Sequence, residues 1–242
     1  MNADTLIVIP IRMGSTRFPG KPLVHIKGKP MIMHVWKQAK LSKSGDVIVA
    51  CCDNIVKDYL LESKIPFVMT KKNLNSGTDR VYKAMQASLK KKSYKYVINL
   101  QGDLPDISSG SIKKIASLIR VKGINIATLV SRIRELKKIK DQNIVKVALA
   151  KTGKYNKAVY FSRAPIPFGS KIFYEHIGIY AYTIKALKIF VNLKMGELEK
   201  IESLEQLRAL ENDIEINISK IKNAPFSIDT PKDLKNFIKM KS

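Results

Sequence analysis

Residues 6–22, LIVIPIRMGSTRFPGKP, contain an apolar run that passes directly into a basic, glycine-containing loop. The run from Leu6 to Ile9 predicts a buried strand, and an amphipathic segment follows a short distance after the loop. The loop, Pro10 to Pro22, therefore leaves the end of a strand. In open α/β sheets, ligands bind at that edge, so this stretch indicates both a fold class and a place to look for function.

The loop combines fixed positive charge with small hydroxyl side chains and glycine. Its members are Arg12, Gly14, Ser15, Thr16, Arg17, Gly20 and Lys21. Such a set suits a polyphosphate, which needs cations, hydroxyl donors and close backbone approach. The order matches neither a P-loop nor a dinucleotide-binding fingerprint. A surface loop with three solvated cations is the alternative, but the run from Pro19 to Pro22 fixes a turn at the strand end.

Length and composition describe a folded protein without a membrane segment. With 242 residues and 45% hydrophobic content, the chain can bury a sizeable core. No run approaches the roughly 20 apolar residues of a membrane span, and a signal peptide is not evident, so we expect a cytoplasmic protein.

The two cysteines, Cys51 and Cys52, are adjacent and would face opposite sides of a strand. We interpret them as core thiols.

The formal net charge of +24 is the most conspicuous bulk property. Nucleic-acid binding, an anionic membrane surface or a lysine-biased composition could each account for it. The lysines are spread over the whole length, including residues 71–72, 90–92 and 137–138, without a compact arginine-rich patch. The pattern favours solvated faces, and we expect no specific nucleic-acid partner.

The order of apolar segments predicts an α/β protein with a doubly wound, mostly parallel sheet. Strands are predicted at 6–9, 47–51, 66–69, 96–100 and 126–130, with helices at 31–41, 56–63, 81–89 and 108–121. From about Lys146 the pattern changes to strands at 145–150, 157–161 and 177–182 without helices between them, which predicts an antiparallel insertion. Helices are predicted again at 184–192 and 197–210. We expect a single domain over 1–242, with the antiparallel subregion at about 131–182.

Two polar clusters follow predicted strands or open predicted helices. In Asn75 to Arg80, Ser76 or Thr78 could cap the next helix or could present its hydroxyl to a ligand, and the residues leave both open. Asp103 directly follows the predicted strand at 96–100, near the expected phosphate loop. Because Mg²⁺ prefers oxygen ligands shared between carboxylates and phosphates, Asp103 is a metal candidate. The alternative is an aspartate in a turn before Pro105.

A third cluster lies near the C-terminus. Thr230 as N-cap, Pro231 at the first helical position and Asp233 at the third predict a helix start. This structural account leaves Asp229 unexplained.

Taken in order, these segments resemble the 3-deoxy-manno-octulosonate cytidylyltransferases, also called CMP-KDO synthetases, where KDO is 3-deoxy-D-manno-octulosonate. The resemblance covers nearly the whole chain. It rests on IPIRMGSTRFPGKPL, SGTDR, NLQGDLP, YFSRAPIP, HIGIYAY, ESLEQLRALE and IDTPKDL.

The resemblance implies a nucleotide-diphospho-sugar transferase-like, Rossmann-type fold and a Mg²⁺-dependent nucleotidyltransferase. Such an enzyme converts CTP and KDO to CMP-KDO and pyrophosphate for lipopolysaccharide biosynthesis. It also implies a homodimer, with the antiparallel subregion serving sugar binding and dimerisation. No nucleophilic serine or cysteine is needed, because the chemistry relies on positioning and charge neutralisation.

The motifs assign roles position by position. Catalysis is assigned to Arg12, Lys21, Asp103 and Asp229, and the metal to Asp103 and Asp229. Nucleotide binding is assigned to Arg12, Ser15, Thr16, Arg17, Lys21, Ser76, Gly77 and Thr78. Sugar binding is assigned to Arg80, Gln101, Arg163, His176, Tyr180, Glu205 and Gln206, with Arg163 suited to the sugar carboxylate.

This sequence departs from the family pattern at Leu104, where a glutamate is usual, and at Asp79, where aspartate replaces glutamate. One alternative within the class is transfer to another acidic sugar, an 8-amino KDO analogue or a sialic acid. Sialate enzymes favour lysine where this chain has Arg17, which argues against the latter. From a different class, the alternative is a basic, non-catalytic nucleic-acid-binding protein.

Overall fold

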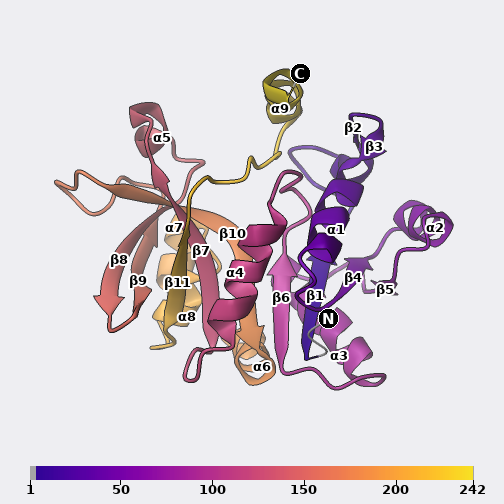
Figure 1. Cartoon of the computed structure of the whole chain (residues 1–242), viewed down its shortest axis with the longest axis horizontal. Helices are drawn as coiled ribbons and strands as arrows, with labels where there is room; N and C mark the ends of the chain where they lie inside the picture. The colour runs from indigo at the N-terminus through magenta and orange to yellow at the C-terminus, as the bar shows by residue number, and fades with distance from the viewer. Residues whose placement is uncertain (1–3, 242) are drawn as a thin grey trace. The chain divides into compact units, whose positions relative to one another are not determined.

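The computed structural model describes residues 4–241, which divide into two compact units. Unit 1 comprises residues 4–113 and 225–241, and unit 2 comprises residues 114–224. Figure 1 shows both, with the chain coloured from its N-terminus to its C-terminus. The C-terminal segment of the chain thus returns to the unit that contains the first loop.

Unit 1 is built on a parallel sheet. Its strands β1 (Thr5–Pro10), β4 (Asp46–Cys51), β5 (Phe67–Met69) and β6 (Tyr96–Leu100) pair in the order β5-β4-β1-β6. All six residues of β1 are buried, as a strand with neighbours on both edges and helices on both faces requires. The carboxyl ends of all four strands therefore meet at one edge.

Helices cover both faces of this sheet. Helix α1 (Met31–Leu41) lies in front of the strands in Figure 1 and α3 (Gly77–Leu89) behind them, while α2 (Asn54–Glu62) lies beside β5. Between β1 and α1 come the short 3-10 helix η1 (Lys21–Leu23) and a hairpin of β2 (His25–Ile26) and β3 (Lys29–Pro30). Helix α9 (Pro231–Lys241) ends the chain. Helix α4 (Ser109–Ile119) leads from unit 1 into unit 2.

Unit 2 is largely antiparallel. Its strands are β7 (Ile126–Ile133), β8 (Lys146–Thr152), β9 (Tyr155–Ser162), β10 (Phe173–Thr183) and β11 (Ile216–Ile221), in the order β10-β7-β11-β9-β8. Among these described strands the β11–β7 pairing is parallel and the others are antiparallel. Its helices are α5 (Leu136–Lys140), α6 (Ile184–Asn192), α7 (Glu197–Glu202) and α8 (Leu207–Leu210).

The predicted fold class is confirmed, and several predicted elements have the observed bounds, namely α1, β6 and α6. The antiparallel pairing of β8 with β9 is also confirmed, whereas the antiparallel pairing of β7 with β10 was not predicted. None of the helices within residues 4–241 is long and apolar enough to cross a membrane. The prediction of a single domain over 1–242 stays a prediction.

The predicted continuous helix at 197–210 is wrong. Ser203 has a left-handed backbone, with φ of 54°, which ends α7 and separates it from α8. The three-residue spacing of Ile201, Leu204, Leu207 and Leu210 continued across this break and concealed it. Strand β11 was not predicted, although Ile214 to Ser219 alternates apolar and polar residues.

Candidate active site

The loop after β1 is closed by its own backbone. The Met13 carbonyl accepts hydrogen bonds from the amides of Ser15 and Gly20, both at 3.0 Å. Gly20 has φ of 76°, a left-handed conformation that disfavours any residue with a Cβ, and it leads directly into η1 at Lys21. The turn that the Pro-Gly-Lys-Pro sequence predicted therefore sets the position at which the Lys21 side chain leaves the backbone.

The turn after β6 packs closely beneath this loop. A Cβ at Gly102 would lie 2.6 Å from Ile11 Cγ2, so only glycine allows this approach. The next residue is Asp103. Its carbonyl accepts a hydrogen bond from the Ile228 amide at 3.0 Å, which joins the turn after β6 to the segment that precedes α9.

Burial and capping fix Asp229 in that segment. Ile228 is fully buried in an apolar cluster with Ile26, Met31 and Phe237. The Asp233 carboxylate accepts hydrogen bonds from the Asp229 and Thr230 amides, and the Asp233 amide donates to Thr230 Oγ1 at 3.2 Å. The predicted helix start at Thr230 is therefore confirmed, and it fixes Asp229 just before the N-terminus of the helix.

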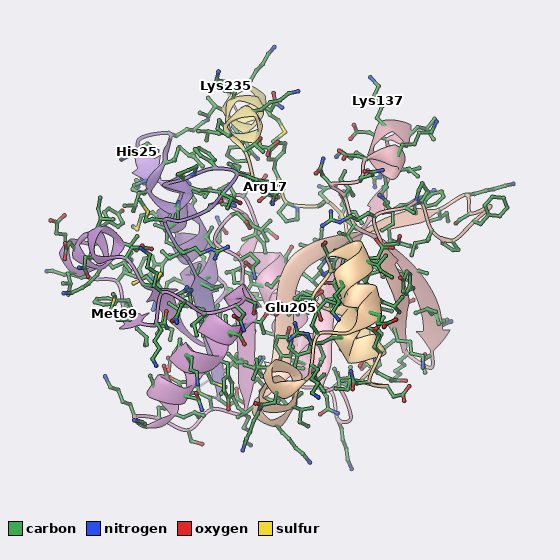
Figure 2. All side chains as sticks on the ribbon, turned by 180° about the vertical axis from the view of Figure 1, so that it is seen from behind. Arg17, His25, Met69, Lys137, Glu205 and Lys235 are labelled. Atoms are coloured by element: carbon green, nitrogen blue, oxygen red, sulfur yellow. The ribbon has the colours of Figure 1, made fainter. Side chains whose placement is uncertain are left out.

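These local structures bring the two aspartates to one cation. Lys21 Nζ lies 2.9 Å from Asp103 Oδ2 and 3.2 Å from Asp229 Oδ1, and the Lys21 side chain is only 13% exposed. Arg17 adds a second contact to Asp229 Oδ1, at 3.1 Å. In Figure 2, Arg17 lies toward the same end of unit 1 as His25 and Lys235. Two carboxylates that are distant in the sequence thus share the basic residues of the first loop.

A cavity of about 280 Å³ in unit 1 contains these groups. Most of the residues that the sequence analysis assigned to nucleotide, metal or catalysis line it: Arg12, Ser15, Thr16, Arg17, Lys21, Ser76, Gly77, Asp103 and Asp229. Arg80 and Gln101, assigned to the sugar, line it as well. Lys21, Asp103 and Asp229 interact directly, and the other side chains surround them. The arrangement concentrates cationic and hydroxyl groups beside two carboxylates.

The segment 76–80 was expected either to cap a helix or to face a ligand, and the two interpretations are compatible for Ser76. Its hydroxyl accepts from the Asp79 amide at 3.1 Å and Asp79 accepts from the Ser76 amide, which forms a capping box on α3, and Ser76 also lines the cavity. The assignment of Thr78 to the nucleotide is not supported. Thr78 is 2% exposed, is not among the cavity-lining residues and accepts from Asn99 Nδ2 at 3.3 Å.

Arg80 is buried although it lines the cavity. It is 3% exposed, and its guanidinium donates to Thr70 Oγ1 and, at 3.3 Å, to the Lys71 carbonyl. Both acceptors lie just beyond β5. Gln101 Nε2 donates to Asn99 Oδ1 at 3.0 Å. The protein itself therefore orients both side chains at the cavity wall.

The remaining sugar assignments fall in unit 2. Arg163, at the end of β9, uses its guanidinium on backbone carbonyls: Nε donates to Glu202 O at 2.9 Å, one terminal nitrogen to Gln142 O at 2.9 Å and the other to Ser203 O at 3.5 Å. The Glu202 carboxylate accepts from the Arg163 amide at 2.9 Å and from Ser162 Oγ at 2.5 Å. Arg163 thus clamps the left-handed turn at Ser203, a contact that the sequence did not indicate.

His176 and Tyr180 lie together on β10. Their ring centroids are 5.2 Å apart, and His176 Nε2 lies 3.1 Å from Thr128 Oγ1. The Thr128 hydroxyl can donate to the Ile179 carbonyl at 2.7 Å, so the histidine Nε2–H donates to Thr128. Burial lowers the pKa of His176 to about 3 and raises that of Tyr180. The imidazole is therefore neutral near pH 7.

Two buried polar atoms of unit 2, Tyr180 OH and Gln206 Nε2, have no hydrogen-bond partner within residues 4–241. Such groups are costly to bury unless a ligand or water pairs with them. Glu205, also assigned to the sugar, precedes Gln206 and is labelled in Figure 2. These side chains are chemically suited to a hydroxyl-rich ligand.

Four further positions complete the comparison with the sequence analysis. Cys51 and Cys52 are free thiols, and burial raises the pKa of Cys51 to about 11, which makes it unreactive. Leu104 is 4% exposed. Asp53, which follows the predicted strand at 47–51, accepts a hydrogen bond from the Met13 amide at 2.8 Å. Its one sequence signal is an acidic side chain at the carboxyl end of a strand.

Within residues 4–241 no three His, Cys, Asp or Glu side chains gather into a group that could hold a metal alone. Asp103 and Asp229 nevertheless offer two convergent carboxylates, the hard oxygen ligands that Mg²⁺ prefers. The pair fits a cation that takes its other ligands from phosphate oxygens and water.

The chain is similar to known cytidylyltransferases along most of its length. A family model described as "Cytidylyltransferase" matches residues 6–216. A 3-deoxy-manno-octulosonate cytidylyltransferase of Thermodesulfovibrio yellowstonii is 44% identical, over 95% of each chain. One from Paramagnetospirillum magneticum is 40% identical, over 95% of this chain and 94% of that one. A solved structure of CMP:2-keto-3-deoxy-manno-octonic acid synthetase complexed with CTP matches with a TM-score of 0.90 and 33% identity, covering 99% and 98% of the two chains.

Proposed function

The chain belongs to the 3-deoxy-manno-octulosonate cytidylyltransferase family, and from that premise we propose that it activates KDO with CTP through the cavity of unit 1. The family reaction joins CMP to the sugar and releases pyrophosphate. One observation carries the assignment of the cavity: Lys21 from the first loop is paired with both Asp103 and Asp229. Cations for a triphosphate and carboxylates for a metal are thus available side by side.

The chemistry requires positioning and charge neutralisation. The anomeric hydroxyl oxygen of KDO forms a bond to the α-phosphorus of CTP, the bond to pyrophosphate breaks, and the hydroxyl proton is released. In this proposal Arg12, Arg17 and Lys21 bind the triphosphate and neutralise the charge that builds up on the leaving pyrophosphate. Ser15 donates a hydroxyl hydrogen bond to a phosphate oxygen, and Ser76 does so by exchanging its bond to the Asp79 carboxylate for one to phosphate. No covalent intermediate with the protein is needed.

We propose Mg²⁺ as the cofactor, held by Asp103 and Asp229 together with phosphate oxygens. When bound, the ion would supply Lewis-acid polarisation of the α-phosphate. The role of the protein is to orient the two carboxylates, which the Ile228 amide and the Asp233 cap do through the backbone. The convergent carboxylates support this proposal.

For the sugar, we propose roles for Arg80 and Gln101 at the cavity of unit 1 and, in unit 2, for the side chains that the family motifs assign. The buried hydroxyl of Tyr180 and the buried amide of Gln206 are available for hydroxyl groups of KDO. His176 and Glu205 complete the set that the family motifs assign. Arg163 is proposed to act on the sugar, in addition to fixing the turn at Ser203.

The setting of the reaction is also a proposal. Family membership supports a role in lipopolysaccharide biosynthesis, where activated KDO is consumed. A cytoplasmic location would match the need for CTP, and a homodimer is the assembly that the resemblance implies. Size-exclusion chromatography with light scattering would test the dimer directly.

A pyrophosphate-release assay tests the function. Purified protein with CTP, KDO and Mg²⁺ should release pyrophosphate, and omitting KDO or Mg²⁺ should abolish release. No release under these conditions would overturn the proposal. The relatives described above give no support to another acidic sugar or to nucleic-acid binding. Specificity constants for KDO, its 8-amino analogue and sialic acid would rank the sugars, and a salt titration with DNA would test nucleic-acid binding.

A further inference from the structure

Asp53 makes an unusual hydrogen bond for a residue at the start of a helix. It occupies the N-cap position of α2, where an aspartate side chain ordinarily accepts from an amide of its own helix. In this structure it makes no such bond. Its Oδ2 atom instead accepts from the backbone amide of Met13, at 2.8 Å, in the first loop.

This contact continues the pairing of β1 with β4 beyond the end of the strands. The Ile11 amide donates to the Ala50 carbonyl at 2.9 Å, in the manner of the preceding parallel ladder. Two residues later, Met13 donates to the Asp53 carboxylate instead of to a backbone carbonyl. The Asp53 side chain therefore supplies the hydrogen-bond acceptor at the point where the backbone turns from β4 into α2.

Met13 is also the residue on which the loop closes. Its carbonyl accepts from the Ser15 and Gly20 amides, so one carbonyl group fixes both ends of the segment that carries the hydroxyl and arginine side chains. Gly20 leads directly to Lys21, which pairs with both aspartates of the cavity. Asp53 itself does not line the cavity.

We propose that Asp53 is a positioning residue for CTP, which acts by anchoring Met13 and thereby holding the first loop in its binding conformation. This inference rests on the proposed binding of the triphosphate by that loop. A charged acceptor on a backbone amide makes one of the stronger protein hydrogen bonds. Without this hydrogen bond the loop would become ordered only when CTP binds, and the free-energy cost of that ordering would lower the affinity for CTP.

The test compares Asp53→Ala and Asp53→Asn with wild type by steady-state kinetics and by calorimetric titration with CTP in the absence of KDO. We expect Asp53→Ala to weaken CTP binding about tenfold, equal to about 1.4 kcal/mol, while KM for KDO changes less than about twofold. Asp53→Asn keeps an oxygen acceptor without the charge and should recover part of the loss. Asp58→Ala is the matched control, because it removes an exposed carboxylate from the same helix.

The outcomes separate this inference from the proposed function. If wild type neither binds CTP nor releases pyrophosphate, the proposed function fails. If wild type does both and Asp53→Ala binds CTP as wild type does, the anchoring role is wrong. A variant with a lowered melting temperature but unchanged CTP affinity, or with KM raised equally for CTP and KDO, would show a general structural role and would also overturn the inference.

Discussion

Asp103 and Asp229 are joined to each other by the backbone hydrogen bond from the Ile228 amide to the Asp103 carbonyl, and they share the ammonium of Lys21. Two carboxylates this close to one another repel unless a cation lies beside them. Lys21, together with Arg17 on Asp229, therefore offsets their charge in the protein alone. A divalent cation bound to the same carboxylates would compete with that ammonium.

Replacing Lys21 with methionine should strengthen cation binding and weaken nucleotide binding. Removing a unit charge that is in contact with both carboxylates raises the local negative potential, so Mn²⁺ affinity of the nucleotide-free protein should rise at least about tenfold. The KM for CTP should rise as well, because a phosphate ligand is lost. Electron paramagnetic resonance of free Mn²⁺ during titration measures the first effect. Lys37→Met, at an exposed lysine of α1, is the control, and equal Mn²⁺ affinities in all three proteins would contradict the prediction.

Asp103→Asn should lower kcat at least about 100-fold, because it removes the charge of a proposed metal ligand while it keeps the shape of the side chain. The melting temperature should change little, since the Ile228 bond uses the Asp103 backbone carbonyl. Single-turnover and steady-state rates measure the effect, and circular dichroism checks the fold. Turnover near that of wild type would remove Asp103 from the metal site.

Much of the fold could be predicted because β1, β4 and β6 of unit 1 are largely buried on both faces and the helices are amphipathic. The site followed from one rule, that the carboxyl ends of parallel strands share an edge, which placed Asp103 near the first loop. Asp229 required the family motif. The position of Asp229 beside Asp103 depends on the fully buried Ile228, whose packing partners include residues that are distant in the sequence.

Other features depend on backbone direction, which residue types alone do not specify. The break at Ser203 needs a left-handed serine, and apolar spacing gave no sign of it. The bond from Met13 to Asp53 depends on where one loop amide points. Likewise, Arg163 was expected to meet a sugar carboxylate because arginine favours such pairs, but in the structure its guanidinium donates to three backbone carbonyls.

Arg163→Ala should therefore have two effects. Loss of the bonds to Glu202 and Ser203 should lower the melting temperature, and release of that turn should raise KM for KDO while KM for CTP stays within about twofold. Arg163→Lys should not restore either property, because an ammonium cannot reproduce the planar guanidinium fork. Kinetics with each substrate varied in turn provide the measurement. A defect confined to CTP would show that the assignment of Arg163 is misplaced.

His176 should make stability depend on pH. Burial lowers its pKa in the folded protein to about 3, whereas in the unfolded chain the value is about 6.5. Below about pH 6.5 the unfolded chain therefore binds a proton that the folded protein does not, so stability falls as the pH decreases, by up to about 1.4 kcal/mol per pH unit. Above that pH both states hold a neutral imidazole, and this contribution is constant.

Urea denaturation of wild type and His176→Gln between about pH 7.5 and about pH 5 isolates this contribution, since glutamine does not titrate. We expect the free energy of unfolding of wild type, relative to that of His176→Gln, to decline steadily as the pH falls below about 6.5. His25→Gln, at an exposed histidine of the β2–β3 hairpin, is the control over the same range. If the His176→Gln curve runs parallel to wild type, then His176 accepts a proton in the folded protein as readily as in the unfolded chain. In that case the assignment of His176 as a neutral imidazole that donates to Thr128 would be wrong.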